Sequence, residues 1–181
     1  MSYYLIHVFI TMLIVSNQIL SIDFGSDKDG RNWAIINDGV MGGISIGEAK
    51  LNENSLLFVG QLSFENNGGF ASLRSNRMNL NLKDAEYIEI KYRLEGIHFA
   101  LMLEQHSRFW HPYFSYPLEI TDGKWLTKKI LVEELKETRM SEYTGRTYNQ
   151  ENARSFFRIG FISDDKKEVR FKLEIDYITI H

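Results

Sequence analysis

The residues best suited to recognising a ligand or a partner lie in an aromatic segment in the middle of the chain. Residues 109–117 read Phe-Trp-His-Pro-Tyr-Phe-Ser-Tyr-Pro. On a strand, successive side chains point to opposite faces, so about half of the segment enters the core. Exposed flat rings stack on sugar rings or on a partner protein, whereas burial of both faces beneath a loop is the structural alternative. The outward-facing set is one of two: Trp110, Phe114 and Tyr116, or Phe109 and Tyr113.

Two glycine pairs, Gly42-Gly43 and Gly68-Gly69, mark positions where the backbone turns sharply or strands approach closely. The first pair does not form a phosphate-binding loop, because Glu48 and Ala49 follow the last glycine of residues 40–47 in place of Lys and Ser or Thr. No helical pattern follows, which also excludes a dinucleotide fingerprint. We therefore expect both pairs to be structural turns.

Three polar residues accompany these glycines: Asp38, Glu65 and Arg74. Asp38 can accept hydrogen bonds from turn amides, and Glu65 and Arg74 can form a cross-strand ion pair around the second glycine turn. In a second interpretation the same side chains contact a ligand or a partner, because binding sites of β-sandwiches gather on loops. Both interpretations remain open at the sequence level.

Catalytic and metal-binding patterns are weak. The chain has no Gly-x-Ser-x-Gly motif, and its five histidines have no zinc-type spacing. Asp23 and Asp176, near the two ends of the folded region, are weak candidates for a calcium site. We expect no catalytic residue, no cofactor and no other metal site. An enzyme is the least favoured interpretation, resting only on pairs of carboxylates that could converge for sugar hydrolysis: Asp38, Glu65, Glu104 and Asp176.

The composition is that of a soluble domain rich in strands. The chain has 181 residues, of which 44% are hydrophobic and 13% aromatic, and it contains no cysteine, which excludes disulfides and thiolate chemistry. A net charge of −3 gives no indication of nucleic-acid binding. Thirteen glycines against two prolines favour strands joined by glycine turns over a helical bundle.

Apolar and polar residues alternate with a period of two over residues 56–64, 88–94, 99–103 and 169–177, which is typical of half-buried strands. After Tyr177 the alternation changes register, and a β-bulge would explain the change. About ten short strands predict an all-β jelly-roll sandwich. The one convincing helical segment is residues 132–142.

The first 21 residues differ from the rest of the chain. Leu5 to Val15 is largely apolar, and no charged side chain precedes Asp23. This run is too short to span a bilayer but suits a signal peptide cleaved after Ser21, which predicts an exported protein. An uncleaved anchor over residues 1–22 is the second interpretation. A mis-set start, for which Met12 is the candidate, would make the protein cytoplasmic, and an N-terminal core strand is the remaining interpretation. Residues 22–181 are predicted to form one domain.

The sequence resembles the complex I intermediate-associated protein 30 family over residues 22–181. The resemblance is carried by two specific blocks, Asp38-Gly-Val-Met-Gly-Gly-Ile-Ser45 and Leu62-Ser-Phe-Glu-Asn-Asn-Gly-Gly-Phe-Ala-Ser-Leu-Arg74. A third block consists of Phe161–Asp164 followed by Phe171–Ile178. It implies a galactose-binding-like jelly roll without known enzymatic activity. Eukaryotic members assist the assembly of respiratory NADH:ubiquinone oxidoreductase, which implies a protein partner.

Two functions therefore remain open. The first is a non-enzymatic assembly module that binds a protein. The second is an exported carbohydrate-binding module that uses an aromatic sheet face. The candidate ligand- or partner-binding residues are Asp38, Glu65, Arg74, Trp110, Tyr113 and Tyr116, and the candidate structural turns are Gly42, Gly43, Gly68 and Gly69.

Overall fold

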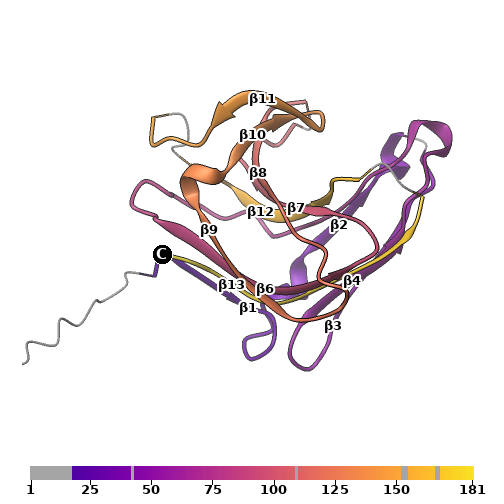
Figure 1. The fold of residues 1–181 in the computed structure, drawn as a ribbon, viewed down its shortest axis with the longest axis horizontal. Helices are drawn as coiled ribbons and strands as arrows, with labels where there is room; N and C mark the ends of the chain where they lie inside the picture. Colours follow the sequence, from indigo (N-terminus) through magenta and orange to yellow (C-terminus); the bar gives the residue numbers. More distant parts are fainter. Residues whose placement is uncertain (1–17, 42, 109, 152–154, 166–167) are drawn as a thin grey trace, which may run out of the picture.

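A computed structural model describes residues 18–181 except 42, 109, 152–154 and 166–167. Two antiparallel sheets face each other across one hydrophobic core (Figure 1). This confirms the predicted β-sandwich of jelly-roll type. In the described residues the only helical elements are short 3-10 turns: η1 (Asp29–Asn32), η2 (Asp38–Met41), η3 (Glu65–Asn67) and η4 (Val132–Glu134).

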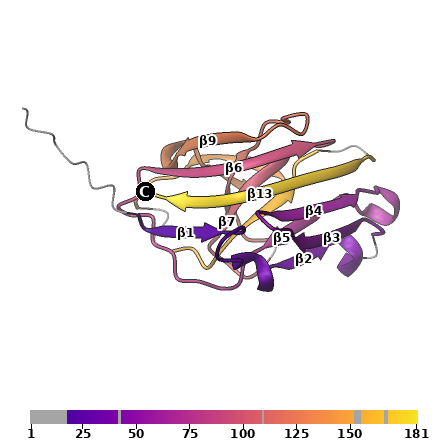
Figure 2. The ribbon, with the colours of Figure 1, turned by 90° about the horizontal axis from the view of Figure 1, so that it is seen from below.

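The first sheet has six strands, and the long C-terminal strand runs through its middle (Figure 2). β13 pairs with β6 along one edge, while β4 and then β1 share the other edge. The register shifts between Ile175 and Tyr177, which places the expected bulge at Asp176. The sheet order is β3 (Ile46–Leu51), β4 (Leu56–Gln61), β13 (Arg170–Ile180), β6 (Tyr87–Glu95) and β9 (Leu126–Leu131), with β1 (Leu20–Asp23) beside β13.

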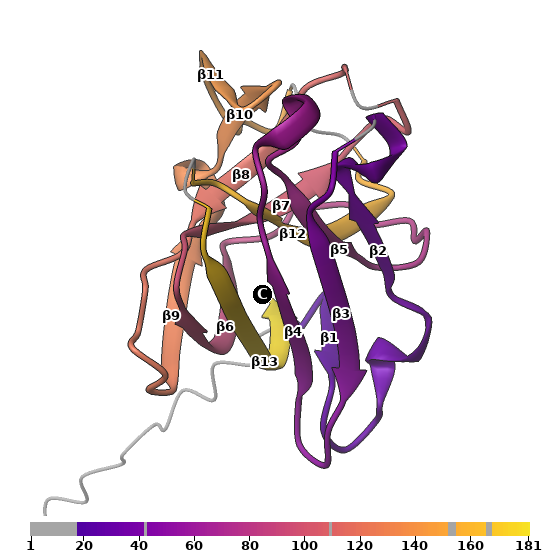
Figure 3. The same ribbon diagram turned by 90° about the vertical axis from the view of Figure 1, so that its right-hand side faces the viewer.

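The second sheet has seven strands and ends in a hairpin at one corner of the molecule (Figure 3). Its order is β11 (Glu142–Thr147), β10 (Lys136–Arg139), β8 (Tyr113–Pro117), β7 (Phe99–Glu104), β12 (Arg158–Ser163), β5 (Ala71–Arg74) and β2 (Ala34–Asn37).

The core is built from the alternating apolar residues that the sequence predicts. Phe58, Ile88, Leu94 and Leu101 are fully buried, as are the inward residues of β13. Rings from both sheets meet in it, and Phe99 lies 5.8 Å from Phe58 in an edge-to-face arrangement. Such pairs add to the stabilisation that burial of the apolar surface provides.

The prediction of a helix over residues 132–142 is wrong. Only Val132–Glu134 forms a 3-10 turn, and the rest belongs to the hairpin of β10 and β11. Met140 and Ser141 both have positive φ (50° and 63°), so they close a two-residue turn between Arg139 and Glu142. Helix propensity is a weak preference, and here the pairing of β10 with both β8 and β11 overrides it.

The described N-terminal region joins the fold at β1, which begins two residues before the predicted domain start at residue 22. Leu20 pairs with Ile180, and the Ile19 N–H donates to the Ile180 carbonyl (2.8 Å). The predicted leader lies mostly outside the described residues. Among the described residues, no helix has the length and apolar character needed to cross a membrane.

Candidate functional site

Asp38 lies at the junction of three loops and is 1% exposed. Its carboxylate accepts hydrogen bonds from the Ser45 N–H (3.0 Å), the Ser45 hydroxyl (2.5 Å) and the Gly69 N–H (2.6 Å). Burial alone would raise the pKa of Asp38, but these donors outweigh burial and lower it. The charged carboxylate therefore joins the two motif blocks to each other, which is a structural role.

The glycines of the motif blocks make room for this carboxylate. A Cβ atom at Gly43 would lie 2.3 Å from Asp38 Cγ, and one at Gly68 would lie 2.5 Å from Asp38 Oδ2. Gly69 has φ +123°, a conformation that side chains rarely adopt. The turn requirement predicted from the sequence thus takes two forms, close packing at Gly43 and Gly68 and backbone conformation at Gly69. Gly42 lies outside the described residues.

The predicted ion pair between Glu65 and Arg74 is not formed. Glu65 is exposed and begins the 3-10 turn η3, where its carbonyl accepts from the Gly68 N–H (3.0 Å). Arg74 instead pairs with Glu104, with Nη1 2.6 Å from Oε1. The reason is the strand register: Arg74 pairs with Gly160, and Gly160 pairs with Met102, so Arg74 shares a sheet face with Glu104, two residues after Met102.

The outer face of the seven-stranded sheet, the side facing away from the core, gathers the polar residues of six strands. Residues that pair across neighbouring strands point to the same face, so the registers define rows. One row contains Arg158, Glu104, Tyr113, Thr138 and Tyr143, and the next contains Ala34, Arg74, Gly160, Met102, Ser115, Lys136 and Thr147.

Glu104 is the buried centre of this face. The side chain is 9% exposed and lies between two guanidinium groups. Burial raises the pKa of Glu104, an effect that Arg74 and Arg158 partly oppose. Glu104 Oε2 lies 3.7 Å from Arg158 Nη1, too far for a hydrogen bond. In the described structure neither Glu104 Oε2 nor Arg158 Nε has a hydrogen-bond partner, although both are buried.

The predicted aromatic residues divide between the two faces of β8. Tyr113 lies on the outer face next to Glu104, and burial raises the pKa of Tyr113 to about 12. Phe114 is buried in the core, and Tyr116 packs against the core from the same side. Tyr116 is therefore separated from Tyr113 by the sheet. Phe109 lies outside the described residues.

Trp110 is not on a strand but in the loop between β7 and β8, where the residue is 45% exposed. Its carbonyl accepts a hydrogen bond from Arg139 Nε (3.1 Å), which ties the loop to the β10–β11 hairpin. Met140 and Tyr143 of that hairpin are 58% and 53% exposed. We refer to Trp110, Met140 and Tyr143 as the corner surface.

The two calcium candidates are engaged within the protein. Asp23 Oδ1 accepts from the N–H groups of Gly25 (2.8 Å) and Ser26 (2.7 Å), and Asp176 Oδ2 lies 2.6 Å from Lys91 Nζ. Across the residues that the structure describes, no three or more His, Cys, Asp or Glu side chains are grouped to hold a metal ion. A structural calcium between them stays a prediction.

Sequence reasoning did not find Arg158 or the exposed hairpin residues. Alternation around residues 158–163 could have placed Arg158 on the outside of its strand. Only the register of β12 against β7 puts it opposite Glu104, 54 positions earlier in the chain. The exposed hairpin residues of the corner surface, Met140 and Tyr143, do not follow from the sequence because residues 132–142 have the pattern of a helix.

Solved structures with a similar fold include carbohydrate-binding modules and an agarase. Two family 11 modules from Clostridium thermocellum match with TM-scores of 0.58 and 0.62 at 14% and 11% identity. They cover 83% and 90% of this chain and 88% and 95% of theirs, and one was solved in complex with a β-1,3-1,4-mixed-linked tetrasaccharide. The agarase AgWH50C matches with a TM-score of 0.58 at 10% identity, over 88% of this chain and 24% of its own. At these identities the likeness shows the fold alone.

Among curated proteins, none matches the sequence of this chain. The family comparison is more informative. Residues 22–175 match the family described as Complex I intermediate-associated protein 30. The matched region contains both motif blocks that the Asp38 carboxylate joins, and it accounts for most of the sandwich. The chain therefore belongs to the complex I intermediate-associated protein 30 family.

Proposed function

We propose that this protein is a non-catalytic assembly module that binds a partner protein through the corner surface. The observation that carries the proposal is the exposure of Trp110, Met140 and Tyr143 where the β10–β11 hairpin meets the β7–β8 loop. Trp, Tyr and Met are enriched in protein interfaces, and exposed apolar side chains at one place mark such sites. The family supports a protein partner of the respiratory assembly type.

Cationic groups border the corner surface and indicate the character of the partner. Arg108 Cζ lies 5.4 Å from the Trp110 ring centre, and Lys136 Nζ lies 5.6 Å from that of Tyr143. Arg139 lies between them on β10. A partner with an apolar patch and acidic groups around it would complement this surface.

The test is a pull-down from detergent-solubilised membranes with the tagged full chain, in which NADH:ubiquinone oxidoreductase subunits are quantified by mass spectrometry. The double variant Trp110→Ala/Tyr143→Ala is expected to lose at least ten-fold of the captured subunits. Trp125→Ala is the matched control, because Trp125 is 41% exposed but precedes β9 of the other sheet. Equal capture by the unmodified chain, the double variant and Trp125→Ala would contradict docking at the corner surface.

Carbohydrate binding is the second candidate function, and the outer face around Tyr113 favours it. Tyr113 offers an aromatic ring beside the incompletely hydrogen-bonded Glu104 and Arg158. Sugar sites combine a ring for stacking with polar groups for the hydroxyls. A glycan array with the full chain and with Tyr113→Ala tests this function. Absence of glycan binding, with the fold intact, would remove it.

A further inference from the structure

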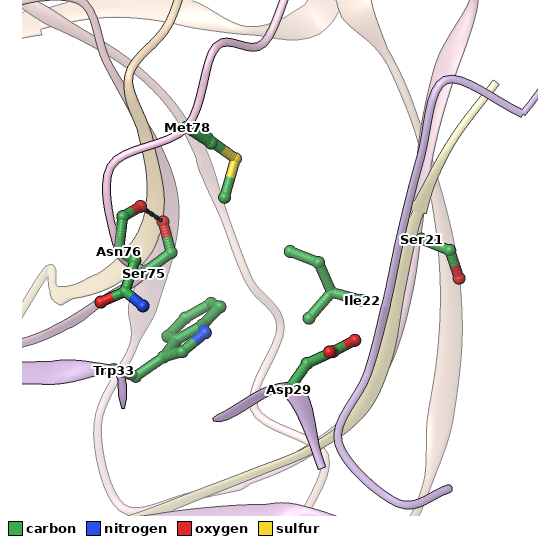
Figure 4. Close-up of a pocket in the computed structure, with 7 residues that line it drawn as sticks. All are labelled: Ser21, Ile22, Asp29, Trp33, Ser75, Asn76 and Met78. Atoms are coloured by element: carbon green, nitrogen blue, oxygen red, sulfur yellow. Dashed lines mark hydrogen bonds between the residues drawn. The ribbon is translucent and has the colours of Figure 1, made fainter. Parts of the chain in front are cut away.

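A surface cavity of about 180 Å³ lies between β1, η1 and the segment after β5. Figure 4 shows Ile22 and Asp29 on one side of it and Trp33, Ser75, Asn76 and Met78 on the other. We refer to it as the Trp33 cavity. It is smaller than sites for drug-sized ligands, which occupy roughly 300–1,000 Å³, so it suits a ligand of one small ring or a short chain.

Trp33 is held in place by packing and directs its indole edge toward the cavity. Its ring stacks on Phe161 with 6.1 Å between ring centres, and Phe24 meets it edge-on at 5.0 Å. The indole nitrogen points to the side where Asp29 lies (Figure 4). Within the described chain this N–H makes no hydrogen bond. The cavity therefore contains a donor in a fixed position that is available to a ligand.

Two further side chains complete the polar lining. Asp29 Oδ2 accepts from the Asp23 N–H (2.8 Å), which fixes the carboxylate and leaves Oδ1 without a partner in the described structure. The Asn76 side-chain amide is also unpartnered there, and its nitrogen points toward Trp33 (Figure 4). Ile22 and Met78 supply apolar surface between these groups. The lining thus offers donors and an acceptor around an apolar wall.

From this arrangement we infer that the Trp33 cavity binds a small neutral polyol, such as a single hexose ring. A hydroxyl group can donate to Asp29 and another can accept from the indole N–H, while C–H groups contact Ile22 and Met78. An anion would meet the Asp29 charge without a Lys, Arg or His in the lining. A cation would meet the N–H edge of the indole rather than its π-face, where cations bind.

The experiment is saturation-transfer NMR on the full chain with three probes: glucose, glucuronate and tetramethylammonium. Glucose is expected to receive saturation, and the other two to receive at least five-fold less. Binding of tetramethylammonium in preference to glucose would overturn the inference, as would the absence of glucose binding. A comparison of maltose with glucose distinguishes the end of a sugar chain from a free sugar. Tighter binding of maltose than of glucose assigns the cavity to a terminal ring, and weaker binding assigns it to a free sugar.

Two cavity variants and one control variant test whether the saturation of glucose comes from binding in the Trp33 cavity. Trp33→Phe keeps an aromatic ring against Phe161 but removes the N–H donor, and we expect at least a five-fold loss of affinity for glucose. Asp29→Asn keeps an acceptor for the Asp23 N–H but presents an amide N–H in place of Oδ1, so we expect at least a three-fold loss. Trp110→Phe is the matched control and should bind glucose unchanged.

Melting curves show whether each variant is folded. If glucose binding is unchanged in both folded cavity variants, or is lost in Trp110→Phe, the sugar lies elsewhere and the inference is wrong. If Trp33→Phe fails to fold, Asp29→Asn alone decides, because its side chain is exposed and makes one hydrogen bond in the described structure. These outcomes are separate from protein docking, which depends on the corner surface.

Discussion

The Asp38 carboxylate is fully buried, yet no cation pairs with it in the described part of the chain. Its charge is balanced by N–H and hydroxyl donors from the loops that contain Ser45 and Gly69. Removing one partner of such a network leaves the others buried and unsatisfied, at about 1–3 kcal/mol for each group. The geometry of these loops therefore depends on the ionisation of one carboxylate.

Acid should destabilise the protein partly through Asp38. The pKa of Asp38 is lower in the folded protein than its ordinary value of 3.8. Its contribution is therefore present above pH 3.8 and is lost as the pH falls through the folded-state pKa. We expect Asp38→Asn to lower the free energy of unfolding by about 2 kcal/mol at pH 7 and to flatten its acid dependence. Urea unfolding between pH 2 and pH 7 measures both.

Two other carboxylates with shifted pKa values also contribute to the pH dependence of stability. The pKa of Glu174 is also lowered, because hydrogen bonds from Ser55 and Arg93 outweigh the effect of burial. The pKa of Glu104 shifts in the opposite direction, because burial raises it. Protonation of Glu104 at low pH therefore favours the folded state. Glu65→Gln, at an exposed position, is the control and should leave the free energy of unfolding at pH 7 unchanged. A profile for Asp38→Asn parallel to that of the parent protein would contradict the role of Asp38.

The glycines beside Asp38 give a second prediction at this scale. Gly43→Val should lower the free energy of unfolding by more than ~1 kcal/mol because the new side chain collides with the Asp38 carboxylate. Gly69→Val should do the same because of its positive φ. Gly39→Ala is the control, since no heavy atom lies within 4 Å of its added Cβ and its φ is not positive. Thermal melts in which neither valine variant differs from Gly39→Ala would disprove both roles.

Single elements differ in how well the sequence predicts them. The strands over residues 56–61 and 87–95 follow from alternation alone, because one face of each is buried and the other is solvated. The hairpin over residues 136–147 does not, because all residues of β11 are exposed and no alternation arises. The pairing of Arg74 and Arg158 with Glu104 depends on cross-strand register, which a single sequence does not encode locally.

The β10–β11 turn offers a test of the hairpin. Its central residues, Met140 and Ser141, both have positive φ, which Asn and Gly adopt more readily. Met140→Asn/Ser141→Gly should therefore raise hydrogen-exchange protection of the hairpin by about 0.5–1 kcal/mol. Ser141→Ala should give no gain. If residues 132–142 formed a helix, the double variant would instead destabilise this segment.

At the scale of the whole molecule, the domain boundary depends on a strand that the predicted cleavage would cut. Chains beginning at Gln18 and at Ile22 should differ in stability, because Leu20 and Ser21 pair with β13. We expect the shorter chain to melt about 2–4 °C lower, which corresponds to roughly 1 kcal/mol in a domain of this size. Equal melting temperatures would show that β1 contributes nothing before Ile22. Mass spectrometry of the natural protein then identifies which N-terminus exists.

The chain order of the six-stranded sheet also constrains how the protein is made. β4 and β6 are synthesised early, but both lie against β13, whose last residues come about 85 or more positions later. Until then each of them has an open edge that can pair with other chains. A ribosome-bound nascent chain therefore carries two strands that each have an unpaired edge until β13 is made, and the six-stranded sheet is complete only when Ile180 has emerged.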